Sequence, residues 1–276
     1  MRLDDDGDRS NVEDQRGSRT GAGLKLGLGG TVALIVLSLV FKQDMFALLG
    51  TSPGGGGPAL SEAEVQERAS AEKGLEHTAV ATFNDSQRTW SRAVPYYRPA
   101  TLVLFWDEVQ SGCGGASAAM GPFYCPADEK VYVDLGFYRE LATRFGAPGE
   151  FAQAYVIAHE VGHHLQNVLG TAGKVREAQE RDPAARNALS VRMELQADCL
   201  AGVWGRVAKD RDLLDPGDVE QGLDAAAAVG DDRIQESATG RVNPESFTHG
   251  SAAERARWFR RGLESGRLDA CDTFAR

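Results

Sequence analysis

A helical repeat of apolar residues between Pro148 and Gly170 predicts a long helix with one buried face. The apolar side chains recur at steps of three and four residues, and Gly170 suits the end of the helix. His159, Glu160 and His163 fall in the middle of the same stretch. Leaving these polar groups buried and unpaired would cost several kcal/mol. The pattern therefore predicts that they share a binding partner. The apolar positions are Phe151, Tyr155, Ala158, Gly162, Leu165 and Leu169.

The three polar residues belong to the sequence His159-Glu160-Val161-Gly162-His163, an H-E-x-x-H motif. Residues four apart project from the same side of a helix, so both imidazoles can bind one metal ion. Glu160 would then lie beside the metal, where it can act as general base on water whose pKa the metal lowers. The alternative is a surface helix whose polar face holds these residues. The apolar surroundings of the motif favour the metal site.

A catalytic zinc site needs a third protein ligand and one open position. Glu194 begins the sequence Glu-Leu-Gln-Ala-Asp on a second predicted helix, which starts at Asp182 and Pro183. Glu194 and Asp198 share one face of that helix because they are four residues apart. We expect Glu194 to bind the metal and Asp198 to accept the free N–H of a ligand imidazole. The apolar neighbours of both residues argue against two ordinary solvated acids.

Other histidines and acids near the motif are weaker candidates for the site. His164 points about 100° away from His163 around the helix, so it is expected to pack or to face solvent. Glu177 and Glu180 lie in a charge-rich connection, where solvation is the simpler interpretation. His77 lies in the N-terminal helical region and has no partner nearby in the sequence.

His249 differs from these because it lies in a loop just before a predicted helix, where its side chain can project into a cleft. We expect it to be catalytic and to donate a hydrogen bond to the oxyanion that forms when a carbonyl is attacked. The alternative is a structural capping role.

Four cysteines, an even number, are typical of two disulfides in an oxidising compartment. Cys113 and Cys125 flank a glycine-rich loop and form the natural local pair, which leaves Cys199 with Cys271. The alternative is a set of buried free thiols. A cysteine-rich zinc site is disfavoured because the chain has no C-x-x-C pair.

The N-terminal quarter differs in composition from the rest. Residues 1–23 are expected to form a disordered cytoplasmic tail, residues 24–42 a transmembrane anchor and residues 43–59 a glycine-rich linker. The uncharged stretch 26–41 is slightly shorter than the roughly 20 residues that usually cross a bilayer. Basic residues precede it, which predicts a single pass with the N-terminus in the cytoplasm and the rest outside the cell membrane. A cleaved signal peptide is the alternative, but no clear cleavage site follows.

Residues 60–276 are predicted to form one α+β domain, mostly helical, with a small sheet. Ser61 and Glu64 form a capping box for a helix over residues 62–76. Residues 100–108 and 130–134 are rich in β-branched and aromatic residues and predict strands. Further helices are expected over residues 215–230 and 251–264, and Ser251 with Glu254 forms a capping box at the start of the second. The net charge of −10 is spread widely, so no basic surface for nucleic acid is expected.

Several long phrases of this sequence resemble the neutral zinc metallopeptidase family of YpfJ type, a bacterial group of single-pass membrane proteins. The resemblance implies a zincin-like domain whose active-site helix packs beneath a small sheet, with a gluzincin-type glutamate as third ligand. It also implies that one of the predicted strands, 100–108 or 130–134, borders the cleft with a free edge and binds an extended substrate through its main chain. The phrases are CGGASAAMGPFYCPADEKVYVD (113–134), AYVIAHEVGHHLQN (154–167), ELQADCLAGVW (194–204), GDDRIQ (230–235) and PESFTHGSAAERARWF (244–259).

The residues and the resemblance together predict a metalloendopeptidase with one zinc ion per chain that cleaves a peptide or protein substrate at the outer membrane face. The main alternative is a non-catalytic, zinc-stabilised binding module at the cell envelope. Glu160 favours the enzyme, because a purely structural zinc site needs no carboxylate between its histidines and usually closes its fourth position. A receptor or scaffold would have no need of the H-E-x-x-H motif.

Overall fold

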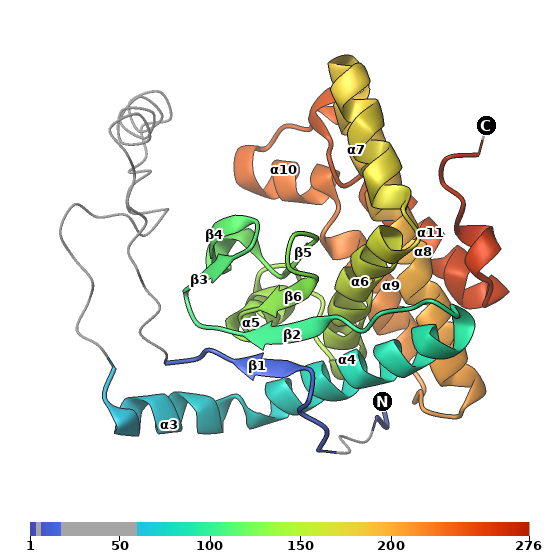
Figure 1. Cartoon of the computed structure of the whole chain (residues 1–276). Helices are drawn as coiled ribbons and strands as arrows, with labels where there is room; N and C mark the ends of the chain where they lie inside the picture. Colours follow the sequence, from blue (N-terminus) through green and yellow to red (C-terminus); the bar gives the residue numbers. More distant parts are fainter. Residues whose placement is uncertain (4–6, 18–59, 276) are drawn as a thin grey trace.

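The computed structural model describes residues 1–3, 7–17 and 60–275 of the 276-residue chain. Helices pack around a small mixed sheet, and the long helix α6 (Glu150–Val168) lies between the sheet and the C-terminal helices (Figure 1). The fold is α+β and mostly helical, as the sequence predicts. Helix α6 therefore brings the H-E-x-x-H residues to the centre of the molecule.

The main sheet has four strands in the order β1 (Val12–Asp14), β2 (Thr101–Leu104), β6 (Lys130–Val133) and β5 (Phe123–Cys125). β1 and β6 run parallel to β2, and β5 runs antiparallel to β6. Successive side chains alternate between the two faces of the sheet. Leu102 and Leu104 accordingly join the main core with the helices, whereas Val103 joins a smaller cluster on the other face.

A second sheet of two strands, β3 (Glu108–Ser111) and β4 (Gly114–Ser117), packs over the smaller cluster and leads into the 3-10 turn η1 (Ala118–Met120). Cys113, in the turn between β3 and β4, is bonded to Cys125 at the end of β5. This disulfide ties the small sheet to the edge strand of the main sheet.

The helical part consists of nine α-helices within the described ranges. They are α3 (Glu62–Ala71), α4 (Lys73–Ala93), α5 (Gly136–Thr143), α6, α7 (Thr171–Arg181), α8 (Arg186–Asp210), α9 (Asp218–Ala228), α10 (Asp231–Thr239) and α11 (Ala252–Ser265). The predicted capping boxes at Ser61 and Ser251 are both present, and Gly266 ends α11 with a φ of 62°. The cysteine pair Cys199–Cys271 is also confirmed, and it ties α8 to the C-terminal turn η4 (Leu268–Cys271).

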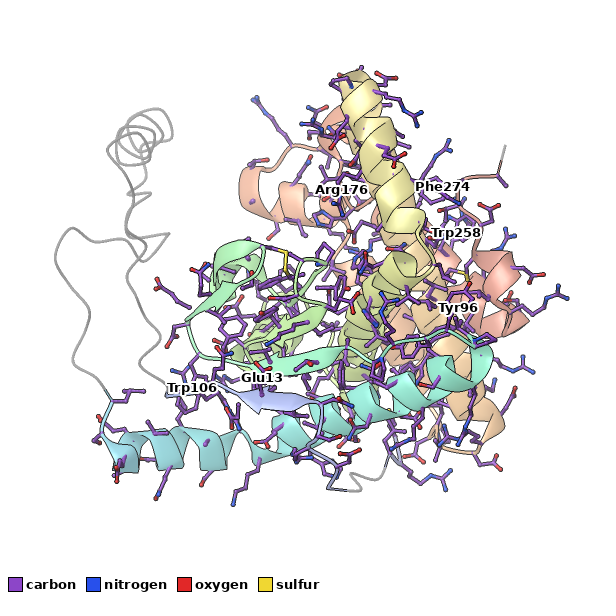
Figure 2. The ribbon with its side chains drawn as sticks, in the orientation of Figure 1. Glu13, Tyr96, Trp106, Arg176, Trp258 and Phe274 are labelled. Carbon is purple, nitrogen blue, oxygen red and sulfur yellow. A yellow bond between two sulfur atoms is a disulfide. The ribbon has the colours of Figure 1, made fainter. Side chains whose placement is uncertain are left out.

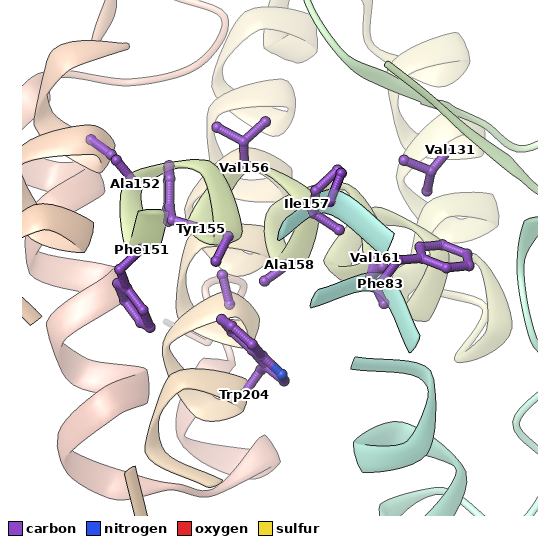
Figure 3. Packing of buried hydrophobic residues seen from close by; sticks show 14 of the residues in the cluster. Phe83, Val131, Phe151, Ala152, Tyr155, Val156, Ile157, Ala158, Val161 and Trp204 are labelled. Atoms are coloured by element: carbon purple, nitrogen blue, oxygen red, sulfur yellow. The ribbon is translucent and has the colours of Figure 1, made fainter. Parts of the chain in front are cut away.

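Small residues allow α8 to pack closely against both α6 and α11. A Cβ atom at Gly162 on α6 would lie 3.1 Å from the backbone oxygen of Ala197 on α8, and one at Gly262 on α11 would lie only 1.9 Å from that of Cys199. Larger side chains fill the rest of this core, with Phe151 of α6 stacked on Trp204 of α8 (Figure 3). The close approach at Gly162 brings the second predicted helix next to the H-E-x-x-H motif.

The prediction of a disordered N-terminal tail is wrong for residues 1–3 and 7–17, because β1 occupies an edge of the main sheet. Backbone hydrogen bonds of 2.8 Å join Leu102 to Asn11 and Gln15 to Leu104. The carboxylate of Glu13 lies 2.7 Å from Lys130 Nζ on β6 (Figure 2). The polar composition of residues 1–23 did not reveal this strand pairing. A polar segment can be ordered without a core of its own when an existing sheet supplies its backbone and charge partners.

The predicted anchor at residues 24–42 and the predicted linker at residues 43–59 lie outside the described residues. Among the helices that the structure describes, none is both long and apolar enough to span a bilayer.

Some predicted elements have different bounds or are divided. The strand expected over residues 100–108 ends at Leu104, and the chain turns before β3. Helix α4 continues well beyond residue 76, where the predicted helix was expected to end. Helices α5, α7 and α10 lie in segments for which no helix was predicted.

The expectation that β2 or β6 forms the free edge at the cleft is wrong, because each is paired on both sides. The edge strands are β1 and β5, and β5 is the one that lines the cavity described below.

Candidate metal centre

Helices α6 and α8 bring together His159, His163 and Glu194, whose ligand atoms all lie within 4.8 Å of one another. The Nε2 atom of His159 lies 3.2 Å from Glu194 Oε2, and the Nε2 atom of His163 lies 3.4 Å from Glu194 Oε1. The two histidines share a face of α6 because they are four residues apart. Glu194 reaches them from α8 because the two helices approach closely at Gly162.

A hydrogen bond to Nδ1 orients each of the two imidazoles. Asp198 Oδ1 lies 2.9 Å from His159 Nδ1, and Gln166 Oε1 lies 2.9 Å from His163 Nδ1. The amide nitrogen of Gln166 donates to the backbone oxygen of Met193, so its carbonyl oxygen faces His163. With Nδ1 donating, each Nε2 faces Glu194 and can offer its lone pair to a metal once it has lost its proton. Asp198 thus contacts the ligand as predicted, and Gln166 is a partner that the sequence did not reveal.

The electrostatics of this cluster favour a bound cation. Burial opposes the protonation of His159, but Asp198 and Glu194 outweigh it and raise the pKa of His159 to about 10. The pKa of His163 is raised in the same way by Glu194, and the pKa of Glu194 is held well below its usual range by the two histidines despite its burial. Two imidazole nitrogens and a carboxylate converge here. The buried Glu194 carboxylate is stabilised by positive charge beside it, which either the histidine protons or a bound cation can supply. This donor set, with three protein ligands, fits a catalytic zinc ion.

Asp198 is held in turn by a buried network that the sequence did not reveal. The Nε atom of Arg255 on α11 donates to Asp198 Oδ2 at 2.9 Å, and the hydroxyl of Tyr155 donates to Oδ1 at 2.5 Å. Burial disfavours the Asp198 carboxylate, but Arg255 and His159 lower its pKa below the usual value. The one sequence feature that could have indicated this network is the position of Arg255 on the apolar face of the predicted C-terminal helix. The network keeps Asp198 ionised beneath the site.

Glu160 lies beside the three ligands and is not one of them. Its side chain is buried, and burial raises the pKa of its carboxyl group. It lines the cavity onto which His159 and His163 also open. A carboxylate with a raised pKa at this place is suited to accept a proton from water near neutral pH.

His249 lines the same cavity from the loop before α11. Its Nδ1 atom lies 3.1 Å from Asp231 Oδ1, and this hydrogen bond raises the pKa of His249. The other oxygen of Asp231 accepts backbone N–H groups of Thr248, His249 and Gly250 at 2.7 to 3.0 Å. Asp231, at the start of α10, therefore fixes both the loop and the imidazole. Asp231 lies in the phrase GDDRIQ that carries part of the resemblance, but the sequence did not reveal this role.

The cavity above the cluster has a volume of about 660 Å³. One of its walls is apolar and is formed by η1, β5 and α5, including Met120, Phe123 and Phe137. Met120 is 67% exposed, which is unusual for such a side chain. The strand β5 lies along this wall with one edge unpaired within the described sheet.

His164 lies outside the ligand cluster and fixes β5. Tyr124 of β5 donates its hydroxyl to His164 Nδ1 at 3.0 Å, and His164 Nε2 donates to the backbone oxygen of Arg98 at 2.6 Å. Burial lowers the pKa of His164, so it stays neutral. Glu177, Glu180 and His77 are exposed on α7 and α4, outside the cluster. The structure thus places these residues outside the cluster of His159, His163 and Glu194.

Comparisons with known proteins agree with this site. A family model described as "Putative neutral zinc metallopeptidase" matches residues 1–274. The uncharacterized protein YpfJ of Escherichia coli (strain K12) is 42% identical over 290 residues, covering 100% of this chain and 99% of that protein. The uncharacterized protein Rv2575 of Mycobacterium tuberculosis (strain ATCC 25618 / H37Rv) is 41% identical over 251 residues, covering 83% and 84% of the two chains. No solved structure gives a significant match.

Proposed function

The chain belongs to the neutral zinc metallopeptidase family, and we propose that it hydrolyses peptide bonds with a zinc ion held by His159, His163 and Glu194. The observation that carries this proposal is the place of Glu160. It is a buried carboxylate with a raised pKa, it lines the cavity next to the three ligands, and it is not needed to hold the metal. We assign it the role of general base.

When bound, zinc supplies Lewis acidity, which lowers the pKa of water and polarises the carbonyl of the scissile bond. Glu160 accepts a proton from the attacking water and transfers it to the leaving amine. His249 donates a hydrogen bond to the developing oxyanion, with Asp231 holding its ring in place. Asp198 and Gln166 keep the ligand imidazoles in the required tautomer.

The surroundings of the site suit an extended peptide. The edge strand β5 offers backbone groups to a substrate main chain, and the apolar wall next to it suits an apolar side chain. This arrangement, with the active-site helix beneath a sheet, is what a zincin-like domain requires. A binding module braced by zinc would not need a cavity of about 660 Å³ at its metal ligands. The two disulfides support an oxidising compartment for the domain.

The test uses the purified full chain, its zinc content and its hydrolysis of a peptide library with and without a chelator. We expect one zinc per chain and cleavage that the chelator abolishes. Glu160→Gln should keep the zinc and lower the rate about a hundredfold or more, because it removes the base and not a ligand. A matched control is Glu180→Gln, which changes an exposed carboxylate outside the cluster. A zinc-loaded wild type that cleaves no peptide, or an active Glu160→Gln variant, would refute the proposal.

A further inference from the structure

The zinc ligands lie between two cavities with different chemistry. The larger one, of about 660 Å³, has the apolar wall described above. A smaller one, of about 250 Å³, lies between α7 and α8, and His163 and Glu194 line both. A peptide whose scissile bond lies at the metal therefore has space on either side of that bond. The smaller cavity is where the next part of the substrate on the α7 side would lie.

Arg176 gives the smaller cavity its charge. It is the one arginine or lysine among the described residues that line this cavity, and it belongs to α7, the helix that continues beyond α6 (Figures 1 and 2). Its side chain is exposed, and it takes part in no ion pair among the described residues. Two arginines line the larger cavity: Arg255 is buried and bonded to Asp198, and Arg144 lies over the ring of Phe145.

The other polar residues of the smaller cavity are already occupied. Gln179 donates through its amide to Ser190 Oγ at 3.0 Å and to the backbone oxygen of Arg186 at 3.2 Å. Glu194 faces the two histidines. The guanidinium of Arg176 is thus the group that remains for a ligand. In a chain with a net charge of −10, an unpaired cation beside the metal ligands favours an anionic group in the substrate.

We propose that the smaller cavity binds a carboxylate of the substrate through Arg176, from either an acidic side chain or the C-terminus of the peptide. A guanidinium can hold a carboxylate by two parallel hydrogen bonds, which gives direction as well as attraction. The substrates would then be peptides that carry a carboxylate close to the scissile bond on the α7 side. This inference rests on the proposed function, because it places the scissile bond at the zinc centre.

The experiment compares kcat/KM of the zinc-loaded full chain for three matched peptide series. One series has an acidic side chain near the scissile bond, one has a free C-terminal carboxylate there, and one has a neutral amide at both places. Arg176→Ala should lower kcat/KM for the preferred carboxylate series by about ten- to a hundredfold, through KM, and leave the neutral series unchanged. Arg176→Lys should restore part of the loss. Arg176→Glu should shift the preference towards basic peptides.

Arg181 on the same helix provides the matched control, because it is exposed and does not line the cavity. Arg181→Ala and Arg181→Glu should change none of the three series. Preference for the first series identifies an endopeptidase subsite, and preference for the second identifies recognition of the chain end. Equal cleavage of all three series by the wild type, or an Arg176→Glu variant with unchanged preference, would overturn the inference and leave the proposed function intact. A wild type that cleaves none of them would instead contradict the proposed function.

Discussion

Arg255 Nε lies 2.9 Å from Asp198 Oδ2, so the C-terminal helix holds the carboxylate that orients the ligand His159. Both side chains are buried, and the other oxygen of Asp198 accepts from His159 and Tyr155. The metal centre therefore depends on three helices, two that carry ligands and a third that carries none. This dependence allows the contributions of the charge pair and of the ligands to be measured separately.

Asp198→Asn should weaken zinc binding by roughly 10- to 100-fold and leave the metal still able to bind. The amide keeps the shape of the carboxylate but is a poorer acceptor for His159 Nδ1–H. Competition with a chromophoric chelator measures the affinity. Glu194→Ala serves as the reference because it removes a ligand and should abolish tight binding. If Glu194→Ala kept stoichiometric zinc, the assignment of the third ligand would be wrong.

Arg255→Leu should lower the free energy of unfolding by about 3–5 kcal/mol, because the buried Asp198 carboxylate would lose its partner. Urea denaturation of the metal-free protein measures this without the contribution of zinc. Arg257→Leu on the same helix is the matched control, since Arg257 is exposed and should change stability by no more than about 0.5 kcal/mol. Equal stability of the two variants would show that the pair is not needed for folding.

His249→Ala should lower kcat by about 10² to 10³ with zinc content and KM nearly unchanged, if the imidazole acts on the transition state alone. Asp231→Asn should give a smaller loss in the same parameter, because the ring keeps its place but loses the carboxylate that raises its pKa. Steady-state kinetics and metal analysis distinguish this from a structural role. A large rise in KM, or loss of zinc, would show that His249 maintains the structure of its loop and does not act on the oxyanion.

Zinc affinity should increase with pH. The pKa of His159 is raised to about 10, so at neutral pH a proton occupies an atom that the metal needs, and the pKa of His163 is raised as well, so this residue keeps its proton to a higher pH than a free imidazole. Each proton that zinc displaces makes the affinity rise by about tenfold per pH unit, up to the pKa of the group concerned. Titrations between about pH 6 and 9, corrected for protonation of the competing chelator, measure this slope. A flat profile would mean that the histidines are already neutral.

Deleting residues 1–17 should destabilise the domain, because it removes β1 and the ion pair between Glu13 and Lys130. For a chain of this size, the melting temperature should fall by on the order of 2–4 °C for each kcal/mol lost. Zinc stoichiometry should be kept, since no ligand is involved. Scanning calorimetry of the deletion variant and the full chain tests this, and identical melting temperatures would show that β1 adds nothing to stability.

The sequence predicted the site better than the architecture around it. His159, His163, Glu194 and Asp198 could be identified because each pair has helical spacing within one apolar segment, and spacing alone fixes which side chains share a face. Arg255 and Asp231 could not, because their partners lie on another helix or in a loop and only packing brings them together. Gln166 is on the same helix as His163, but its amide is oriented by the backbone oxygen of Met193 on α8. Helix α7 was missed because its charged sequence has one buried residue, Val175, and so lacks an apolar repeat.

The pairing of β1 with β2 has a consequence for how the chain can be arranged at a membrane. Strands that share backbone hydrogen bonds lie on the same side of any bilayer, and Leu102 is bonded to Asn11 in this way. A single crossing anywhere between residues 17 and 60 would separate β1 from the domain. Docking of β1 and single-pass insertion of the apolar stretch 26–41 are therefore mutually exclusive states. Whether the outer edge of β2 is occupied by residues 12–14 thus reports the transmembrane topology of the chain.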